Sequence, residues 1–407
     1  MKIEKEILDL GEKIENDLKE QYKKVDLIRE RNFLKVLNAF QEVNLHDSDF
    51  GYTSGYGYSD IGREKTEAIF AKVFGGADAL VRPQIISGTH AINTTLFGLL
   101  RPGDLLLYAS GRPYETAEGI IGLREAYGSL KEFGIEFEEF DYREGINESL
   151  IKKAKVVALQ RSKGYSFKNS ISIEELERII KEIKNINPDA IVMVDNCYGE
   201  FVEEKEPNEV GADVAVGSLI KNPGSGIALT GGYIVGKKEL IAQIANRLTA
   251  PGVGKEIGPM LGLTRNILQG IFFAPLVVSN AVKGTIFASK LFDDRGFEVM
   301  PKFNEKRTDI VQAIKFERED LLLTFAQAIQ NFSPVDSDAE IEPAPLAGYG
   351  NKILMAAGTF VQGSSIELSA DAPLIPPYIG YLQGGIYYEH TKFASLYAIQ
   401  EVLKALK

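Results

Sequence analysis

The sequence predicts an α/β protein with a large domain built on a mostly parallel sheet and a smaller C-terminal α/β domain. Short, continuously apolar segments alternate with amphipathic helical segments as far as about residue 270. This alternation is typical of a parallel sheet that helices cover on both faces. A segment rich in Pro, Gly and acidic residues at 334–350 indicates a loop or hinge. We therefore predict an N-terminal helical arm at 1–50, a large domain at 51–280 and a small domain at 281–407.

Composition limits the classes of function. The chain has 407 residues, with 46 Lys plus Arg against 57 Asp plus Glu, which gives a formal net charge of −11. This charge disfavours binding of nucleic acid or an anionic membrane as the main role. No uninterrupted apolar run approaches the ~18 residues of a membrane-spanning helix. The first residues carry no signal-peptide core, and the single Cys197 excludes an intrachain disulfide. We expect a cytoplasmic protein without a Cys-rich metal site.

The first segment is predicted to be a helix with one apolar face. Ile3, Ile7, Leu10, Ile14 and Leu18 follow one another at intervals of three or four residues, which places them on one side of a helix. Two interpretations stay open. The helix either packs on its own domain or reaches a partner subunit.

The segment that follows the arm differs in composition from its surroundings. Residues 46–62 contain four glycines and four aromatic residues, without a helical or strand period. Irregular Gly-rich backbone is costly to order. The segment is therefore either disordered or held by specific contacts, and the tyrosines favour specific contacts.

The elements of the large domain are predicted from their periodicity. Helices are expected at 63–74, 87–100, 114–133, 172–186 and 237–248, and a further helix at 281–291. Strands are expected at 105–109, 136–140, 155–160, 190–194, 213–216 and 232–235. In sheets of this kind ligands bind at the carboxyl ends of the strands. The residues that directly follow the strands are therefore the first candidates for a site.

Asp195 and Lys221 lie at two of these strand ends. A carboxylate at the end of a buried strand is costly unless a positive group meets it. Lys221 precedes a turn rich in Gly and Pro, so backbone can surround its amine closely. A desolvated lysine loses its proton more easily and can attack a carbonyl. Taken singly, each residue is better explained as capping a turn and pairing with neighbours.

An ordered set of motifs resembles a known family. In chain order the motifs are GYGYSDIGREKTE, SGTHA, LLRPGD, RPYET, VMVDN and GSLIK. The set resembles the pyridoxal 5'-phosphate site of the Cys/Met metabolism enzymes of fold type I. The segment DNCYGEF…TGGYI is similar to the methionine gamma-lyase-like branch known as aluminium resistance proteins. The resemblance covers about residues 50–270. It implies the aspartate aminotransferase fold, with a seven-stranded sheet.

The resemblance implies roles for the residues at the strand ends. Lys221 would hold pyridoxal phosphate as a Schiff base and act as the base on the substrate Cα proton. Asp195 would keep the pyridine nitrogen protonated, which makes the ring an electron sink. Tyr114 would stack on the ring. The expected catalytic residues are therefore Lys221 and Tyr114.

The same resemblance implies a phosphate site at the start of a helix. Ser87, Gly88 and Thr89 would offer backbone N–H groups and hydroxyls where the helix dipole favours an anion. Ser218, three residues before Lys221, would add another hydroxyl.

The Gly/Tyr loop acquires a role in an oligomer from this resemblance. In the resembled group the corresponding loop crosses from a neighbouring subunit and reaches the phosphate. Tyr56, Tyr58 and Arg63 are then candidates for completing the partner's site, which implies a homodimer or homotetramer with shared active sites. The alternative for Arg63 is simple solvation at the start of a helix.

The chain departs from the family pattern where the substrate would bind. Ile220 stands before the lysine in place of the usual Thr. The C-terminal domain usually supplies an arginine for the substrate α-carboxylate, but the segment SSIELSADAPLIPPYIGYLQGG contains none. A carboxylate is best oriented by a bidentate cation. Arg161 and Lys163, just past the strand at 155–160, are the expected replacements, with a solvated basic turn as the alternative.

These observations favour a lyase that acts on a sulfur-containing amino acid by C–S elimination, in the manner of methionine gamma-lyase or cystathionine beta-lyase. An aminotransferase or γ-synthase is the alternative with the same cofactor. A stress protein that binds a phosphorylated metabolite without catalysis is an alternative from another class.

Overall fold

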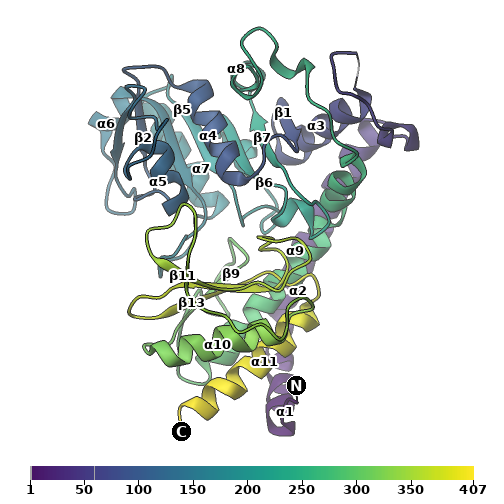
Figure 1. Ribbon diagram of the computed structural model, residues 1–407, viewed down its shortest axis with the longest axis vertical. Helices are drawn as coiled ribbons and strands as arrows, with labels where there is room; N and C mark the ends of the chain where they lie inside the picture. The colour runs from purple at the N-terminus through teal and green to yellow at the C-terminus, as the bar shows by residue number, and fades with distance from the viewer. Residues whose placement is uncertain (1, 59) are drawn as a thin grey trace.

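The structure is a computed structural model that describes residues 2–58 and 60–407, so Met1 and Ser59 lie outside the described residues. Two β-sheets and the helices packed on them form the fold, with the seven-stranded sheet in the upper part of Figure 1 and the six-stranded sheet below it. The α/β class predicted from the sequence is confirmed.

The helices of the first part of the chain are α1 (Lys5–Asp17), α2 (Lys19–Glu42), α3 (Ile61–Phe74), α4 (Gly88–Leu99), α5 (Glu115–Ile121), α6 (Glu148–Lys153), α7 (Ile173–Ile186) and α8 (Lys238–Leu248). The later helices are α9 (Thr264–Asp293), α10 (Glu319–Asn331) and α11 (Tyr388–Ala405). The first sheet consists of β1 (Asp78–Arg82), β2 (Leu105–Tyr108), β3 (Glu136–Glu139), β4 (Ala154–Gln160), β5 (Ile191–Asp195), β6 (Val214–Ser218) and β7 (Gly232–Gly236). The second sheet consists of β8 (Glu298–Met300), β9 (Val311–Lys315), β10 (Ala344–Pro345), β11 (Lys352–Ala356), β12 (Ser369–Pro373) and β13 (Ile379–Gln383).

The first sheet is seven-stranded and mostly parallel, as predicted. Its strand order is β1-β7-β6-β5-β4-β2-β3. β7 runs antiparallel to both of its neighbours, and the other neighbouring pairs are parallel. The carboxyl ends of β4, β5 and β6 therefore meet at one edge of the sheet, where parallel sheets bind their ligands.

Helices cover both faces of this sheet because its strands are apolar on both sides. Leu106 and Ala158 pack into a cluster with α4 and α8. Their chain neighbours Leu107 and Val157 point to the opposite face and pack with α7. Alternation of side chains along a strand separates the two clusters. The near-continuous apolar runs in the sequence follow from this burial.

The second sheet is antiparallel and lies below the first sheet in Figure 1. Its order is β10-β11-β12-β13-β9-β8. Helices α10 and α11 pack on each other, and α10 lies against β11, β12 and β13 (Figure 1). A small cluster that includes Val311 and Tyr381 meets Tyr165, Phe167 and Tyr198 from the first part of the chain. The second sheet therefore faces the strand-end edge of the first.

Helix α9 connects the two parts of the molecule, and the predicted boundary near residue 280 falls inside it. Its length and composition would suffice to cross a membrane, but 72% of its most apolar window is buried within the protein. The sequence predicted helix at 281–291 alone, because a helix buried on most sides loses the amphipathic period. Helix α2 packs along α9, and α1 packs against α9 and α11. The apolar face of α1 is therefore buried on its own chain.

Helix α5 is shorter than the helix predicted at 114–133. It ends at Gly122, which has a φ of 94°. This left-handed conformation suits glycine and stops a helix. Gly128 and Gly134 also have positive φ, so the rest of the predicted helix is irregular. Strand β1 was not predicted from the sequence, because its three apolar residues lie between the charged Asp78 and Arg82, although four of its five residues are buried.

A glycine in α9 permits close packing against the turn that follows Lys221. A Cβ placed on Gly270 would lie 2.7 Å from the carbonyl oxygen of Gly224 and 2.9 Å from its Cα. The Ser225 hydroxyl also donates a hydrogen bond to the carbonyl of Gly270 at 2.7 Å. The approach of α9 thus supports the turn next to the lysine through backbone contacts.

We predict that Gly270→Ala destabilises the protein by about 1–3 kcal/mol, because the added methyl group forces backbone apart. This loss outweighs the helix propensity of Ala, which exceeds that of Gly by about 1 kcal/mol. Urea unfolding measures the difference. Gly119→Ala in α5 is the matched control, since the nearest atom to its added Cβ would lie at 3.8 Å. Equal or greater stability of Gly270→Ala would contradict this packing argument.

Candidate active site

A cavity of about 230 Å³ lies between the strand-end edge of the first sheet and the second sheet. It brings together the residues predicted from the strand ends and the helix start, namely Ser87, Gly88, Thr89, Tyr114, Asp195, Ser218 and Lys221. The second part of the chain adds a group of polar residues that the sequence analysis did not single out, which includes Tyr349, Ser364, Ser365, Ser369, Asp371 and Gln383.

The start of α4 forms one end of the cavity. Ser87 is the N-cap, and its hydroxyl accepts a hydrogen bond from the N–H of His90 at 3.0 Å. A Cβ on Gly88 would lie 3.3 Å from both Cys197 Sγ and Ser218 Cβ. Glycine therefore lets the helix start approach the ends of β5 and β6 closely. The unpaired N–H groups of a helix start attract an anion.

Asp195 and Lys221 come from neighbouring parallel strands. Asp195 ends β5, and its Oδ1 accepts a hydrogen bond from the Cys197 N–H at 3.2 Å. Lys221 follows β6, and its Nζ lies 4.0 Å from the ring centroid of Tyr198. Tyr198 has a φ of 73°, which is strained for a tyrosine. The turn after β5 therefore places this ring against the lysine.

The surroundings of Lys221 raise its pKa above the ordinary value. Burial lowers the pKa, but interactions with the neighbouring Cys197, Tyr198 and Asp195 together raise it more, and of these three groups only Asp195 is a carboxylate. The expectation that desolvation makes this lysine lose its proton more easily is therefore wrong, because the expectation took no account of the nearby anionic group. With its pKa raised, Lys221 keeps its proton at neutral pH.

Tyrosines form one wall of the cavity. The hydroxyls of Tyr114 and Tyr349 lie 3.0 Å apart, and their rings meet edge to face. Tyr165 packs against both rings. Burial raises the pKa of Tyr114 and of Tyr165 far above the ordinary value. These phenols therefore keep their protons and act as neutral hydrogen-bond donors.

Asp371 on β12 adds a second carboxylate to the cavity. It accepts a hydrogen bond from the Tyr165 hydroxyl at 3.2 Å. Burial raises the pKa of Asp371 to about 6. Asp371 lies in the segment where the family pattern led us to expect an arginine. An alternating strand with an acid at an inward position could have drawn attention to it.

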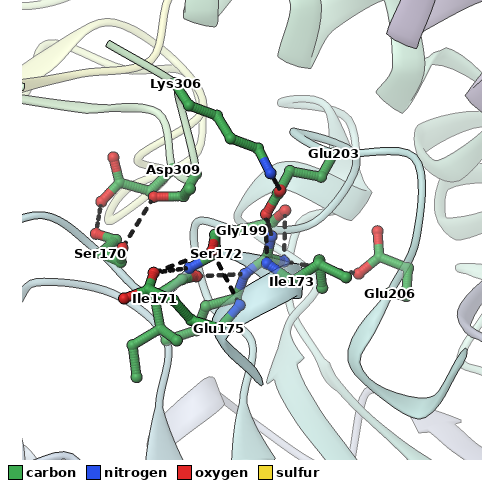
Figure 2. A network of polar contacts seen from close by, with 12 residues as sticks. Ser170, Ile171, Ser172, Ile173, Glu175, Gly199, Glu203, Glu206, Lys306 and Asp309 are labelled. Carbon is green, nitrogen blue, oxygen red and sulfur yellow. Dashed lines mark hydrogen bonds and ion pairs between the residues drawn. The ribbon is translucent and has the colours of Figure 1, made fainter. Parts of the chain in front are cut away.

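Arg161 does not line this cavity, and the expectation that it binds a substrate carboxylate needs correction. Its side chain is completely buried. The guanidinium donates to Asn196 Oδ1 at 2.8 Å, to the carbonyl of Gly199 at 2.9 Å and to Glu203 Oε2 at 2.7 Å. Figure 2 labels Gly199 and Glu203 of this network and shows the contact of Glu203 with Lys306, whose atoms lie 2.6 Å apart. Arg161 therefore ties the ends of β4 and β5 together.

Lys163 is likewise absent from the cavity that holds Lys221. Its Nζ donates to the carbonyl of Val311 at 3.0 Å and lies 3.5 Å from Asp309 Oδ1. Asp309 in turn contacts Ser170 (Figure 2). Burial lowers the pKa of Lys163. The lysine thus joins the segment after β4 to β9, and its predicted substrate role also needs correction.

The residues predicted for a partner's site lie away from the cavity. Arg63 is buried, and its guanidinium donates to the carbonyl oxygens of Gly55 and Gly258 at 3.2 and 3.0 Å. It therefore fixes the Gly/Tyr loop rather than solvating a helix start. Tyr56 is 64% exposed and Tyr58 is 88% exposed, so neither ring reaches the cavity of its own chain.

A buried acid lies beneath the cavity. Glu200 is fully buried, and its Oε1 accepts a hydrogen bond from the Tyr233 hydroxyl at 2.8 Å. Its Oε2 has no partner among the described residues. Burial raises the pKa of Glu200 to about 8. The side chain is therefore mostly protonated at neutral pH.

The chain is similar to a known protein family, to a bacterial protein sequence and to a solved structure. Residues 7–403 match the methionine gamma-lyase family. The chain is 47% identical over 400 residues to the uncharacterized protein YnbB of Bacillus subtilis (strain 168), with 96% of this chain and 95% of YnbB covered. The crystal structure of a carbon-sulfur lyase involved in aluminum resistance from Clostridium novyi NT is similar, with a TM-score of 0.92, 47% identity and coverage of 98% of this chain and 96% of that one.

A more distant structure shares the fold alone. The pyridoxal-5'-phosphate dependent protein YhfS from Escherichia coli has a TM-score of 0.61 and 16% identity, with 94% of this chain and 97% of that chain covered. The predicted fold type I architecture and the family resemblance are therefore confirmed.

The state of Glu200 predicts a pH dependence of stability. The folded protein holds this proton up to about pH 8, whereas an unfolded glutamate releases it above about pH 4.3. The free energy of unfolding contributed by this group therefore falls as pH rises between these values. We expect Glu200→Gln to remove that slope, in urea unfolding at pH 5.5 and pH 8.5. Glu340→Gln, at an exposed acid, is the control. An unchanged slope in Glu200→Gln would show that the acid ionises freely in the fold.

Proposed function

The chain belongs to the methionine gamma-lyase family, and we propose that it is a pyridoxal-phosphate-dependent carbon–sulfur lyase that acts on a sulfur-containing amino acid through Lys221. One observation carries this proposal. An amine, a carboxylate and a helix start, which come from three separate segments, line a single cavity. The similarity to a carbon-sulfur lyase over nearly the whole chain supports it.

The residues present fit the cofactor. Its phosphate needs several donors in one place, and the start of α4 offers backbone N–H groups next to the hydroxyls of Thr89 and Ser218. The missing side chain of Gly88 leaves Cys197 and Ser218 in close contact with this helix start. Lys221 would supply the amine that reacts with the aldehyde, and Asp195 would supply the negative charge that pairs with a protonated ring nitrogen. The absence of a hydroxyl at Ile220 leaves Ser218 as the hydroxyl donor from this strand end.

Lys221 would hold the cofactor and move the substrate proton. When bound, pyridoxal phosphate supplies an aldehyde that reacts with amines and a ring that withdraws electrons from the substrate α-carbon. If Asp195 were paired with a positive ring nitrogen, its contribution to the raised pKa of Lys221 would be reduced. The amine would then release its proton more readily and could take up the proton from Cα.

Asp195 and Tyr114 would orient the cofactor. Asp195 would hold a proton on the ring nitrogen, and the hydrogen bond from Cys197 fixes its Oδ1. Tyr114 is anchored at both ends, since its backbone N–H donates to Gln160 Oε1 at 2.8 Å and its hydroxyl meets Tyr349. Its ring is therefore held in one position, as stacking on a planar group requires.

The overall reaction would be an elimination followed by hydrolysis. The Cα–H bond and a C–S bond break, and the sulfur leaves with the electron pair and takes up a proton as a thiol. Water then converts the remaining fragment to a 2-oxo acid and ammonia. Tyr114, whose buried phenol keeps its proton, lines the cavity and would offer a neutral hydroxyl to the departing sulfur.

We further propose that the active site is shared between subunits of a homodimer or homotetramer in the cytoplasm. Tyr56 and Tyr58 are exposed on a loop that Arg63 holds in place. A loop that is fixed yet presents two aromatic rings to solvent suits a surface covered by another copy of the chain. The single cysteine is buried, in keeping with a reducing compartment.

We predict that Lys221→Ala abolishes turnover, by about 10³-fold or more, because both the attachment point and the base are lost. The native protein should be yellow with pyridoxal phosphate, and borohydride should fix the label on Lys221, as peptide mass spectrometry can show. Lys155→Ala, at an exposed lysine of β4, should retain colour and activity. A screen of L-methionine and L-cystathionine for 2-oxo acid release measures turnover. Colourless protein that takes up no cofactor would refute the proposal.

We predict that mixed oligomers recover activity from two inactive variants. Lys221→Ala lacks the amine, and the double variant Tyr56→Ala/Tyr58→Ala lacks the loop rings. Co-expression should restore about a quarter of the wild-type activity, because half of randomly mixed dimers are hybrid and each holds one complete site. Light scattering gives the oligomeric state. A monomer, or hybrid dimers without recovered activity, would contradict shared sites.

A further inference from the structure

The charges of the cavity are unusual for a site that receives an amino acid. Among the described residues that line it, the carboxylates are Asp195 and Asp371, and the cation is Lys221. The proposed function assigns Asp195 to the ring nitrogen and Lys221 to the aldehyde. Asp371 is then left without an assigned role and without a cationic partner.

The contacts of Asp371 are hydrogen bonds from neutral groups. Tyr165 donates to its Oδ2 at 3.2 Å, and Gln383 is its other side-chain hydrogen-bond partner. The titratable groups that face it are the four tyrosines Tyr114, Tyr198, Tyr349 and Tyr381, together with Tyr165 and Lys221. Lys163 shares a small pocket with Asp371, but its Nζ donates to the carbonyl of Val311 and pairs with Asp309. Since the tyrosine hydroxyls stay protonated, the anion is solvated by donors but is not neutralised.

Neutral donors lie in the same wall of the cavity. Ser364 is 2% exposed and Ser365 is 4% exposed, and neither hydroxyl has a hydrogen-bond partner in the described structure. Buried hydroxyls are seldom left unpaired in proteins. A bound molecule with acceptor oxygens would satisfy them. A substrate α-carboxylate has this chemistry and would be held by hydroxyls in place of the missing guanidinium.

We propose that Asp371 is a specificity residue that binds a positively charged group on the sulfur-bearing side chain of the substrate. The substrate class is therefore an amino acid thioether whose leaving thiol carries an ammonium group. An alkyl thioether such as methionine has no group that pairs with this carboxylate. An acidic leaving group would be repelled by it. This inference rests on the proposed lyase function.

The reaction that tests this inference is a β-elimination. In S-(2-aminoethyl)-L-cysteine the Cα–H and Cβ–S bonds break, and 2-aminoethanethiol leaves with the sulfur electron pair and one proton. Water converts the three-carbon remainder to pyruvate and ammonia. S-propyl-L-cysteine has nearly the same size but a methyl group in place of the ammonium. Comparison of the two compounds therefore isolates the charge.

We expect the wild-type holoenzyme to prefer the aminoethyl compound in kcat/KM by about 10- to 100-fold, the range for a charge-assisted hydrogen bond. Asp371→Asn should bring this ratio close to one. Asp338→Asn, at an exposed acid of the same part of the chain, is the matched control and should keep the wild-type ratio. The wild-type ratio should also fall as pH decreases through about 6, where Asp371 gains a proton.

A binding measurement separates this inference from the proposed function. Calorimetric titration of both compounds into Lys221→Ala supplied with pyridoxal phosphate gives a ratio of dissociation constants without turnover. Failure of the lyase proposal would appear as loss of cofactor uptake and of pyruvate release with both compounds. Failure of the present inference would appear as equal binding and equal turnover of the two, or as a preference that survives Asp371→Asn. If that variant does not fold, a wild-type ratio that is identical at pH 5 and pH 8 overturns the inference.

Discussion

The buried guanidinium of Arg161 is the interaction on which the geometry of the cavity depends. A buried charge is tolerated when several acceptors meet it, and removal of its partners is strongly destabilising. Asn196, Gly199 and Glu203 supply these acceptors and come from the turn that follows β5. The strand-end loop after β4 and the turn that carries Asp195 are thereby held in one arrangement. The residues that face the cavity are positioned by a cation that never touches it.

Neighbouring groups in and beneath the cavity determine the protonation state of Lys221. Burial lowers the pKa of Lys221, but interactions with Cys197, Tyr198 and Asp195 raise it more, so the amine keeps its proton at neutral pH. Glu200 does not form an ion pair with the lysine, because burial keeps its carboxyl group mostly protonated at neutral pH. Neighbouring acids at one strand-end edge therefore differ in charge because they differ in desolvation and partners.

The residues of the second part of the chain that line the cavity differ from the family pattern for the substrate site. The usual arginine is absent, and Asp371 with the hydroxyls of Ser364 and Ser365 occupies the corresponding wall. An arginine in this wall would favour a negatively charged substrate group, whereas Asp371 favours a positively charged one. In the proposed function, the cofactor would be held by the first part of the chain, and the substrate would meet residues of the second part, where the chain departs from the family pattern.

The sequence by itself determined the α/β architecture, the strand ends and the identities of Asp195 and Lys221, because periodicity and motif order are local properties of the chain. Tertiary structure decided the roles of Arg161 and the position of Asp371. Both depend on which segments distant in sequence come together, and charge alone does not reveal whether a side chain faces a cavity or the core. Long helix α9 was similarly hidden, since burial on most sides removes the amphipathic signal that marks a helix in sequence.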